Sequence, residues 1–201
     1  MKSLLVALSL ALLLGGCESM MRADVTQFST LTALPAGRSF VVVAEPQQSG
    51  ALEFQHYAGL VGGALQEHGL VAGKDPATAD LVVVIYYGSL GPHTEVRSEP
   101  GPWGWGWGWR HGYGPWGGEI DSTTYYAQML EVQIFDGPAW RNAVRTMVYQ
   151  GRATGGTTAN DIGAAMPALV RALFEHFPGN HGGVERVTVP LSALPSSGRA
   201  G

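Results

Sequence analysis

The chain has 201 residues, with 12 Lys and Arg against 16 Asp and Glu, which gives a formal net charge of −4 at pH 7. This acidic balance argues against a nucleic-acid partner, which needs a basic face, and against a polybasic grip on anionic lipid. The length suits one domain, and the 29 glycines predict that a good part of it is loop.

The first 17 residues have the pattern of a bacterial lipoprotein signal. Lys2 precedes an apolar run at residues 4–14, and Gly15, Gly16 and Cys17 follow it. A positive end, a short apolar stretch and small residues at the cut are typical of a secretory signal. The run of 11 residues is too short to span a membrane, which takes about 20 residues. We therefore expect cleavage before Cys17.

Cys17 is the only cysteine of the chain, so an internal disulfide is excluded and lipidation is the expected fate of its thiol. Diacylglycerol on the sulfur and a third chain such as palmitate on the new amino terminus would give stable anchoring. An Asp directly after the lipidated cysteine would resemble an inner-membrane retention signal of enteric bacteria. This chain has Glu18 at that position. We therefore expect a lipid anchor in the outer membrane, with the protein on its periplasmic face.

The first half of the mature chain is predicted to run strand, strand, helix, strand. Residues 24–28 alternate in polarity, and residues 39–44 are β-branched and apolar. Across residues 52–69 the apolar side chains recur at spacings of three and four, which indicates a helix that Gly69 ends. Residues 79–88 are the most apolar run after the signal, and we expect a central strand there.

An insertion at residues 89–122 then shows no helical or strand period until its end, which is typical of a long functional or disordered loop. Residues 123–135 and 143–154 alternate again and predict a hairpin. Asn160 or Asp161 can cap a second amphipathic helix.

Residues 185–191 predict an edge strand. The simplest architecture that buries both helical stripes is an α+β fold, with a single mixed, mostly antiparallel sheet and two amphipathic helices packed on one face. The predicted signal peptide, lipidated tether, single domain and flexible tail lie at residues 1–16, 17–23, 24–191 and 192–201.

This order of elements resembles the bacterial lipoprotein family catalogued as domain of unknown function 4136, over roughly residues 24–178. The matching pieces are the strand after the cysteine, the start of the second strand, the end of the first helix, the end of the hairpin and the end of the last helix. They lie at residues 24–28, 39–40, 65–70, 151–153 and 177–178, and the end of the first helix precedes a further matching run at residues 79–83. The resemblance implies a fold and an envelope location, and it supplies no catalytic residues. The insertion departs from the family pattern.

The insertion holds five of the six tryptophans. Four of them alternate with glycine, so in an extended segment their indoles would share one face. Such a row could stack on sugars, or lie at a membrane or protein interface, or have no fixed face because glycine is so flexible. The candidate ligand-binding residues are Trp103, Trp105, Trp107, Trp109 and Trp116.

Other candidates for chemistry are weak. The histidines lack metal-site spacing, although a weak transition-metal site at His93 and His111 stays open. Glu119 and Asp121 would share a strand face, but no nucleophile or second base lies near them in sequence. Residues 155–158 could cradle an anion before the second helix, or could serve as a linker. We predict no catalytic residue, metal or cofactor.

The sequence therefore predicts a lipid-anchored envelope lipoprotein that is not an enzyme and that binds or scaffolds another envelope component. The alternative is a module that contacts glycan or peptidoglycan through the Gly/Trp-rich loop. The expected contacts are the membrane, through lipid on Cys17, and an envelope protein or glycan.

Overall fold

A computed structural model describes residues 19–31, 36–48, 50–99, 119–158, 160–179 and 182–191, with backbone alone for 95–99 and 119–121. Its centre is a seven-stranded sheet with the order β3-β2-β4-β5-β6-β1-β7. The strand β2 runs parallel to its neighbours β3 and β4, and the remaining pairs are antiparallel. The strands are β1 Met20–Ser29, β2 Ser39–Val43, β3 Val71–Ala72, β4 Leu81–Glu99, β5 Glu119–Asp136, β6 Met147–Thr157 and β7 Glu185–Pro190.

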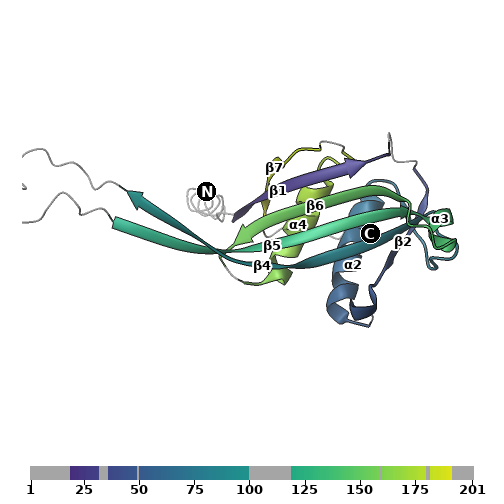
Figure 1. Ribbon diagram of the computed structural model, residues 1–201, viewed down its shortest axis with the longest axis horizontal. Coiled ribbons are helices and arrows are strands. Elements are labelled where there is room, and N and C mark those ends of the chain that lie inside the picture. Colours follow the sequence, from purple (N-terminus) through teal and green to yellow (C-terminus); the bar gives the residue numbers. More distant parts are fainter. Residues whose placement is uncertain are drawn as a thin grey trace, which may run out of the picture.

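Two long helices, α2 (Leu52–Glu67) and α4 (Ile162–Phe174), pack on one face of this sheet (Figure 1). Alternate residues of the central strands point into the core beneath them, and Val83 of β4 and Val132 of β5 are completely buried there. The α+β prediction, with one mixed sheet and both amphipathic helices on one face, is confirmed. A short 3-10 helix, η1 (Pro46–Gln48), and a short helix, α3 (Gly137–Arg141), complete the fold.

Local chemistry accounts for the helix positions. The carboxylate of Asp161 accepts hydrogen bonds from the backbone N–H groups of Gly163 and Ala164, which caps the first turn of α4. In α2, a Cβ on Gly62 would lie 3.7 Å from the ring of Phe40, an ordinary van der Waals distance, so α2 packs against β2 at this position.

The predicted tether at residues 17–23 is too long, because β1 already begins at Met20. Met21 and Ala23 are buried, and Met20 pairs with Pro190 of β7. The edge strand β7 therefore recruits residues that look like a linker in the sequence. The hairpin of β5 and β6 is confirmed, but β6 begins only at Met147 because α3 occupies the connection.

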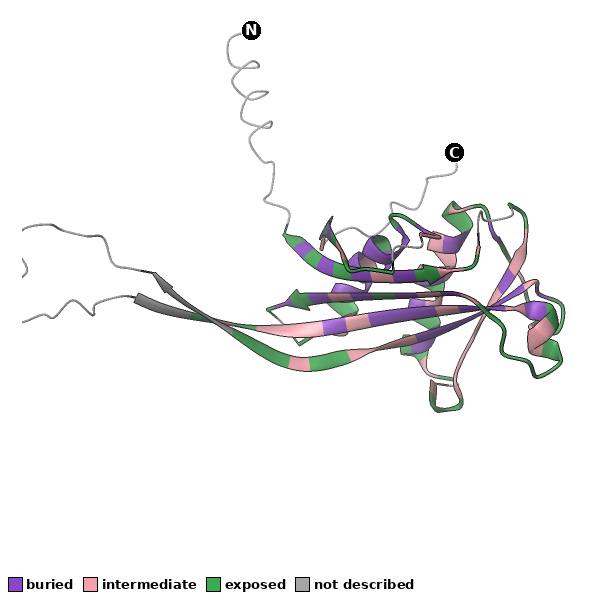
Figure 2. Cartoon of the chain, turned by 45° about the horizontal axis from the view of Figure 1, so that its top comes forward, coloured by how far each residue is buried: buried purple, intermediate pink, exposed green. Residues whose placement is uncertain are grey.

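The insertion predicted at residues 89–122 is wrong at both of its ends, because β4 continues to Glu99 and β5 begins at Glu119. Beyond the pair Tyr126–Thr157, the strands β4 and β5 pair only with each other among the described residues, and they project from the sheet as a two-stranded ribbon (Figure 1). The described side chains of this ribbon are exposed or half-buried (Figure 2). With no buried face, the ribbon has no apolar alternation that could reveal it in the sequence.

Candidate functional site

The sheet face opposite the helices carries an organised polar cluster, because its β5 residues alternate with Leu130 and Val132, which face the helix-covered core. Its centre is Glu131 of β5, which is only 6% exposed. Oε1 of Glu131 accepts hydrogen bonds from Nε2 of Gln133 (2.7 Å) and from Nε2 of Gln150 (2.9 Å). Oε2 of Glu131 accepts from Nε (2.9 Å) and Nη2 of Arg152. We call these four residues the Glu131 cluster.

The register between β5 and β6 builds the Glu131 cluster. Glu131 lies opposite Arg152, and Gln133 lies opposite Gln150. Residues two apart on a strand point to the same face, so two residues from each strand meet above the sheet. Neighbouring side chains bury the carboxylate without removing it from its four donors.

The Glu131 cluster holds its carboxylate in the charged form. Burial opposes ionisation, but the hydrogen bonds from Gln133, Arg152 and Gln150 outweigh it and lower the pKa of Glu131. On β4, opposite Glu131, the hydroxyl of Tyr86 donates to Oε1 of Glu45 at 3.0 Å. Burial and this carboxylate raise the pKa of Tyr86, so its proton is held. At neutral pH the Glu131 carboxylate is therefore ionised and the Tyr86 phenol is protonated.

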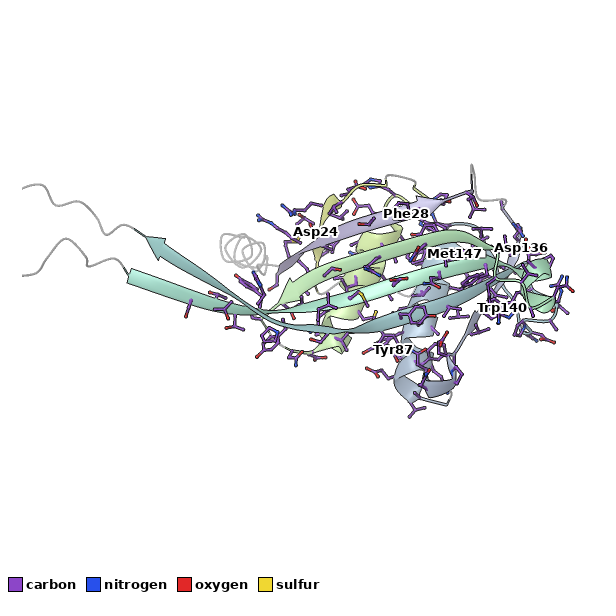
Figure 3. All side chains as sticks on the ribbon, in the orientation of Figure 1. Asp24, Phe28, Tyr87, Asp136, Trp140 and Met147 are labelled. Carbon is purple, nitrogen blue, oxygen red and sulfur yellow. The ribbon has the colours of Figure 1, made fainter. Side chains whose placement is uncertain are left out.

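An apolar area adjoins the Glu131 cluster on the same face. The rings of Phe135 and Trp140 lie 5.1 Å apart, and the guanidinium of Arg145 lies 3.6 Å from the centroid of the Trp140 ring. Phe28 of β1 and Met147 of β6 are exposed apolar residues, and Figure 3 shows both on this side of the sheet. We call the Glu131 cluster and these apolar residues together the open face. Aromatic residues, Met and Arg, which this face combines, are enriched at protein–protein interfaces.

A second concave feature lies on the other side of the molecule. A groove of about 520 Å³ runs along α2 and α4 and reaches the end of β7. Buried Val170 and Phe174 line it, and exposed Glu67, Arg171 and Glu175 stand along it. In the described part of the chain, no helix is long and apolar enough to cross a membrane.

The residues predicted as sites from the sequence fall mostly outside the described ranges. The lipidation candidate and the five ligand-binding candidates lie there, as does His111. Glu119 and Asp121 lie in the first residues of β5, and His93 is exposed on the ribbon. The undescribed candidates are Cys17, Trp103, Trp105, Trp107, Trp109 and Trp116.

Two of the weaker predictions can be compared with the geometry. Gly155, Gly156 and Thr157 lie within β6, so this stretch is neither a linker nor an anion cradle, because it pairs with β5. His68 is within 3.0 Å of the carbonyl of Phe174, which gives this ring a structural partner. Among the described residues, no three His, Cys, Asp or Glu side chains gather as a metal site.

Sequence reasoning missed the Glu131 cluster. A signal was present, because Glu131 and Gln133 share one face of the first hairpin strand, and Gln150 and Arg152 share one face of the second. Whether those faces coincide depends on the register, and α3 in the connection displaces the register from that of a tight turn.

The chain matches one protein family in sequence and several solved structures in fold. The family described as domain of unknown function (DUF4136) matches residues 24–179. A PDZ domain protein from Parabacteroides distasonis is similar in structure, with a TM-score of 0.50 and 12% identity, over 94% of this chain and 43% of that one. The chain thus spans less than half of that structure, and the likeness concerns the fold alone.

Two smaller structures are less similar. The PelC dodecamer from Paraburkholderia phytofirmans has a TM-score of 0.38 and 12% identity, over 74% of this chain and 91% of that one. A DUF4136 family protein from Bacteroides thetaiotaomicron has a TM-score of 0.42 and 13% identity, over 76% and 92%. No curated protein matches the chain in sequence. Because the family match covers most of its length, this chain belongs to the DUF4136 family of domains of unknown function.

Proposed function

We propose that the protein is an envelope lipoprotein, anchored through Cys17 on the periplasmic face of the outer membrane, whose domain binds or scaffolds another envelope component without catalysis. The observation that carries the binding role is the open face. It combines a fully hydrogen-bonded, ionised carboxylate with exposed Phe28 and Met147. A surface of this kind offers contacts rather than a reactive group.

The lipoprotein-signal pattern that ends at Cys17 supports the anchoring part of the proposal, and the start of the fold is compatible with it. The backbone carbonyl of Ser19 accepts a hydrogen bond from the N–H of Leu191 at 2.8 Å, and β1 begins at Met20. Three residues of extended chain reach about 10 Å, so a lipid on Cys17 would hold the Met20 end of the sheet close to the membrane.

Anchoring is tested with the full chain expressed in cells. Wild-type protein should gain the mass of the acyl chains at Cys17 and fractionate with the outer membrane. The Cys17→Ser variant should lack that mass and leave the membrane fraction. Retention of the Cys17→Ser variant in the membrane would contradict the proposed anchor.

Partner binding is tested by crosslinking in intact cells, followed by purification of the lipidated protein. Replacing Phe28 and Met147 with Ser should remove the specific crosslinked species. A control variant replaces Val71 and Val184 with Ser, because these are also exposed apolar residues but lie outside the open face. Equal loss in both variants would contradict the assignment of the binding surface.

A second candidate function is glycan or peptidoglycan contact through the Gly/Trp-rich segment. It is favoured by the ribbon, because residues 119–125 of β5 pair with β4 beyond the end of β6. Seven residues of strand span about 24 Å, so the ends that flank the segment stand clear of the domain.

The tryptophan hypothesis has its own assay. Replacing Trp103, Trp105, Trp107 and Trp109 with Ala should abolish pull-down on peptidoglycan. Replacing Trp140 with Ala should leave the pull-down unchanged, because this tryptophan packs on Phe135 at the other end of β5. Undiminished binding by the fourfold variant would refute glycan contact through this segment.

A further inference from the structure

The groove along α2 and α4 contains space that nothing in the described structure fills. At Gly59 and Gly63, no heavy atom of the described residues outside the adjoining helix backbone lies within 4 Å of the position that a Cβ would take. Glycine weakens a helix interior, and at these two positions the described packing offers no compensation. Their missing side chains keep the groove open above Val170 and Phe174, which form part of its buried wall.

The end of β7 brings the following chain directly to this groove. Pro190 lines the groove, and its backbone pairs with Met20. Leu191 is half-buried, and its N–H is held by the carbonyl of Ser19 at 2.8 Å. The chain therefore leaves the sheet from a fixed point at one end of the groove, and ten further residues, 192–201, follow it in the sequence.

The segment is long enough to follow the helical wall of the groove. Leu194 lies three positions after Leu191, which corresponds to about 10 Å of extended chain, and Arg199 lies eight positions after it, or about 27 Å. From Gly59 to Glu67 the helix advances about 12 Å. The extended segment is therefore longer than this stretch of the helical wall.

The chemistry of the segment is also complementary. Residues 193–195 are Ala-Leu-Pro, which suits an apolar wall. Arg199 is the one charged side chain among residues 192–201, and Glu67, Arg171 and Glu175 are charged residues that line the groove. An added cation there would give this group of charges a balance of two positive and two negative.

We propose that residues 192–201 dock in the groove along α2 and α4, with Leu194 over Gly59 and Gly63 and Arg199 beside Glu67 and Glu175. The docked tail covers the apolar wall of the groove. The groove is a different surface from the open face. A partner segment that binds in the groove must displace residues 192–201, so these residues regulate access to it.

The first test is disulfide crosslinking in the full chain with Cys17 replaced by Ser. Leu194→Cys is combined with Gly63→Cys, or with Arg22→Cys as the matched control. Arg22 lies only two residues from Met20, the partner of Pro190, but its side chain is exposed on the opposite sheet face. A docked tail should crosslink to position 63 within one molecule about tenfold faster than to position 22, as expected for a mostly docked population.

A second test keeps the domain untouched. Trypsin cleavage after Arg199 is compared between the wild-type chain and Leu194→Asp, whose substitution lies five residues from the cleaved bond. Docking predicts several-fold faster cleavage in the variant. Equal cleavage rates, equal crosslinking to positions 63 and 22, or crosslinking to position 63 only between molecules would each overturn the proposal. Saturable occupation of the groove by dodecanoate with no effect of Leu194→Asp would also overturn it, in favour of a lipid ligand.

Discussion

Replacing Glu131 with Gln is the sharpest test of how the open face is built. The substitution keeps the shape of the side chain but removes the charge that accepts two hydrogen bonds from Arg152 and one each from Gln133 and Gln150. Breaking a buried ion pair costs about 3–5 kcal/mol. The side chain of Arg152 is 55% exposed, so water can replace part of its lost hydrogen bonding. We therefore expect a loss of about 2 kcal/mol in the free energy of unfolding.

The assay is urea unfolding of the full chain followed by circular dichroism, in which the midpoint should fall with an unchanged slope. The matched control is Asp24→Asn. Asp24 accepts a hydrogen bond from Nε of Arg186 at the same distance, 2.9 Å, but both side chains are largely exposed. Solvent screens such a pair, so the control should shift the midpoint much less than Glu131→Gln does.

Acid provides a second measure of the same interaction. Because the folded pKa of Glu131 is lowered, its contribution is present above the ordinary carboxyl pKa and is lost as pH falls through the folded value. The stability difference between wild type and Glu131→Gln should therefore shrink on acidification below about pH 4. A difference no larger than that of the Asp24→Asn control, or one that does not shrink in acid, would refute this account of the cluster.

Three further predictions concern the helix-covered side. Gly151→Ala should destabilise strongly, because its Cβ would lie 2.9 Å from Leu173 and still closer to Oη of Tyr149, and Tyr149→Phe should rescue part of the loss in a double-mutant cycle. Asp161→Ala should cost about 1 kcal/mol in urea unfolding through loss of the α4 cap, whereas Asp161→Asn should cost less. Burial is the main reason why the pKa of Tyr57 is raised to about 12. The free energy of unfolding should therefore be constant up to about pH 10 and fall as the pH rises toward 12. An unfolding free energy that does not change over this alkaline range would contradict the prediction.

The sequence predicted best where a single physical requirement acts within one element. Apolar spacing located α2 and α4, and the confirmed cap at Asp161 follows from its side-chain oxygen and the free N–H groups of a first helical turn. Alternation located the hairpin of β5 and β6. These signals persist because burial of one face constrains every second or every third to fourth residue.

The predictions failed where pairing rather than burial defines an element. The strand β1 includes Met20, which resembles a linker until β7 pairs with it. The ribbon formed by residues 91–99 and 119–127 is held by backbone hydrogen bonds, which any side chain permits, so its polar sequence reads as loop.

By itself the sequence determined the family, the α+β class and the helix-covered core, because burial of one face of an element sets the spacing of apolar residues within that element. Only the tertiary structure decided which surfaces are available for function. The register between β5 and β6 brings Glu131 to Arg152, and the approach of α2 to α4 opens the groove beside Gly59 and Gly63. Both depend on relative positions of elements distant in sequence, and a short-range pattern carries no record of those positions.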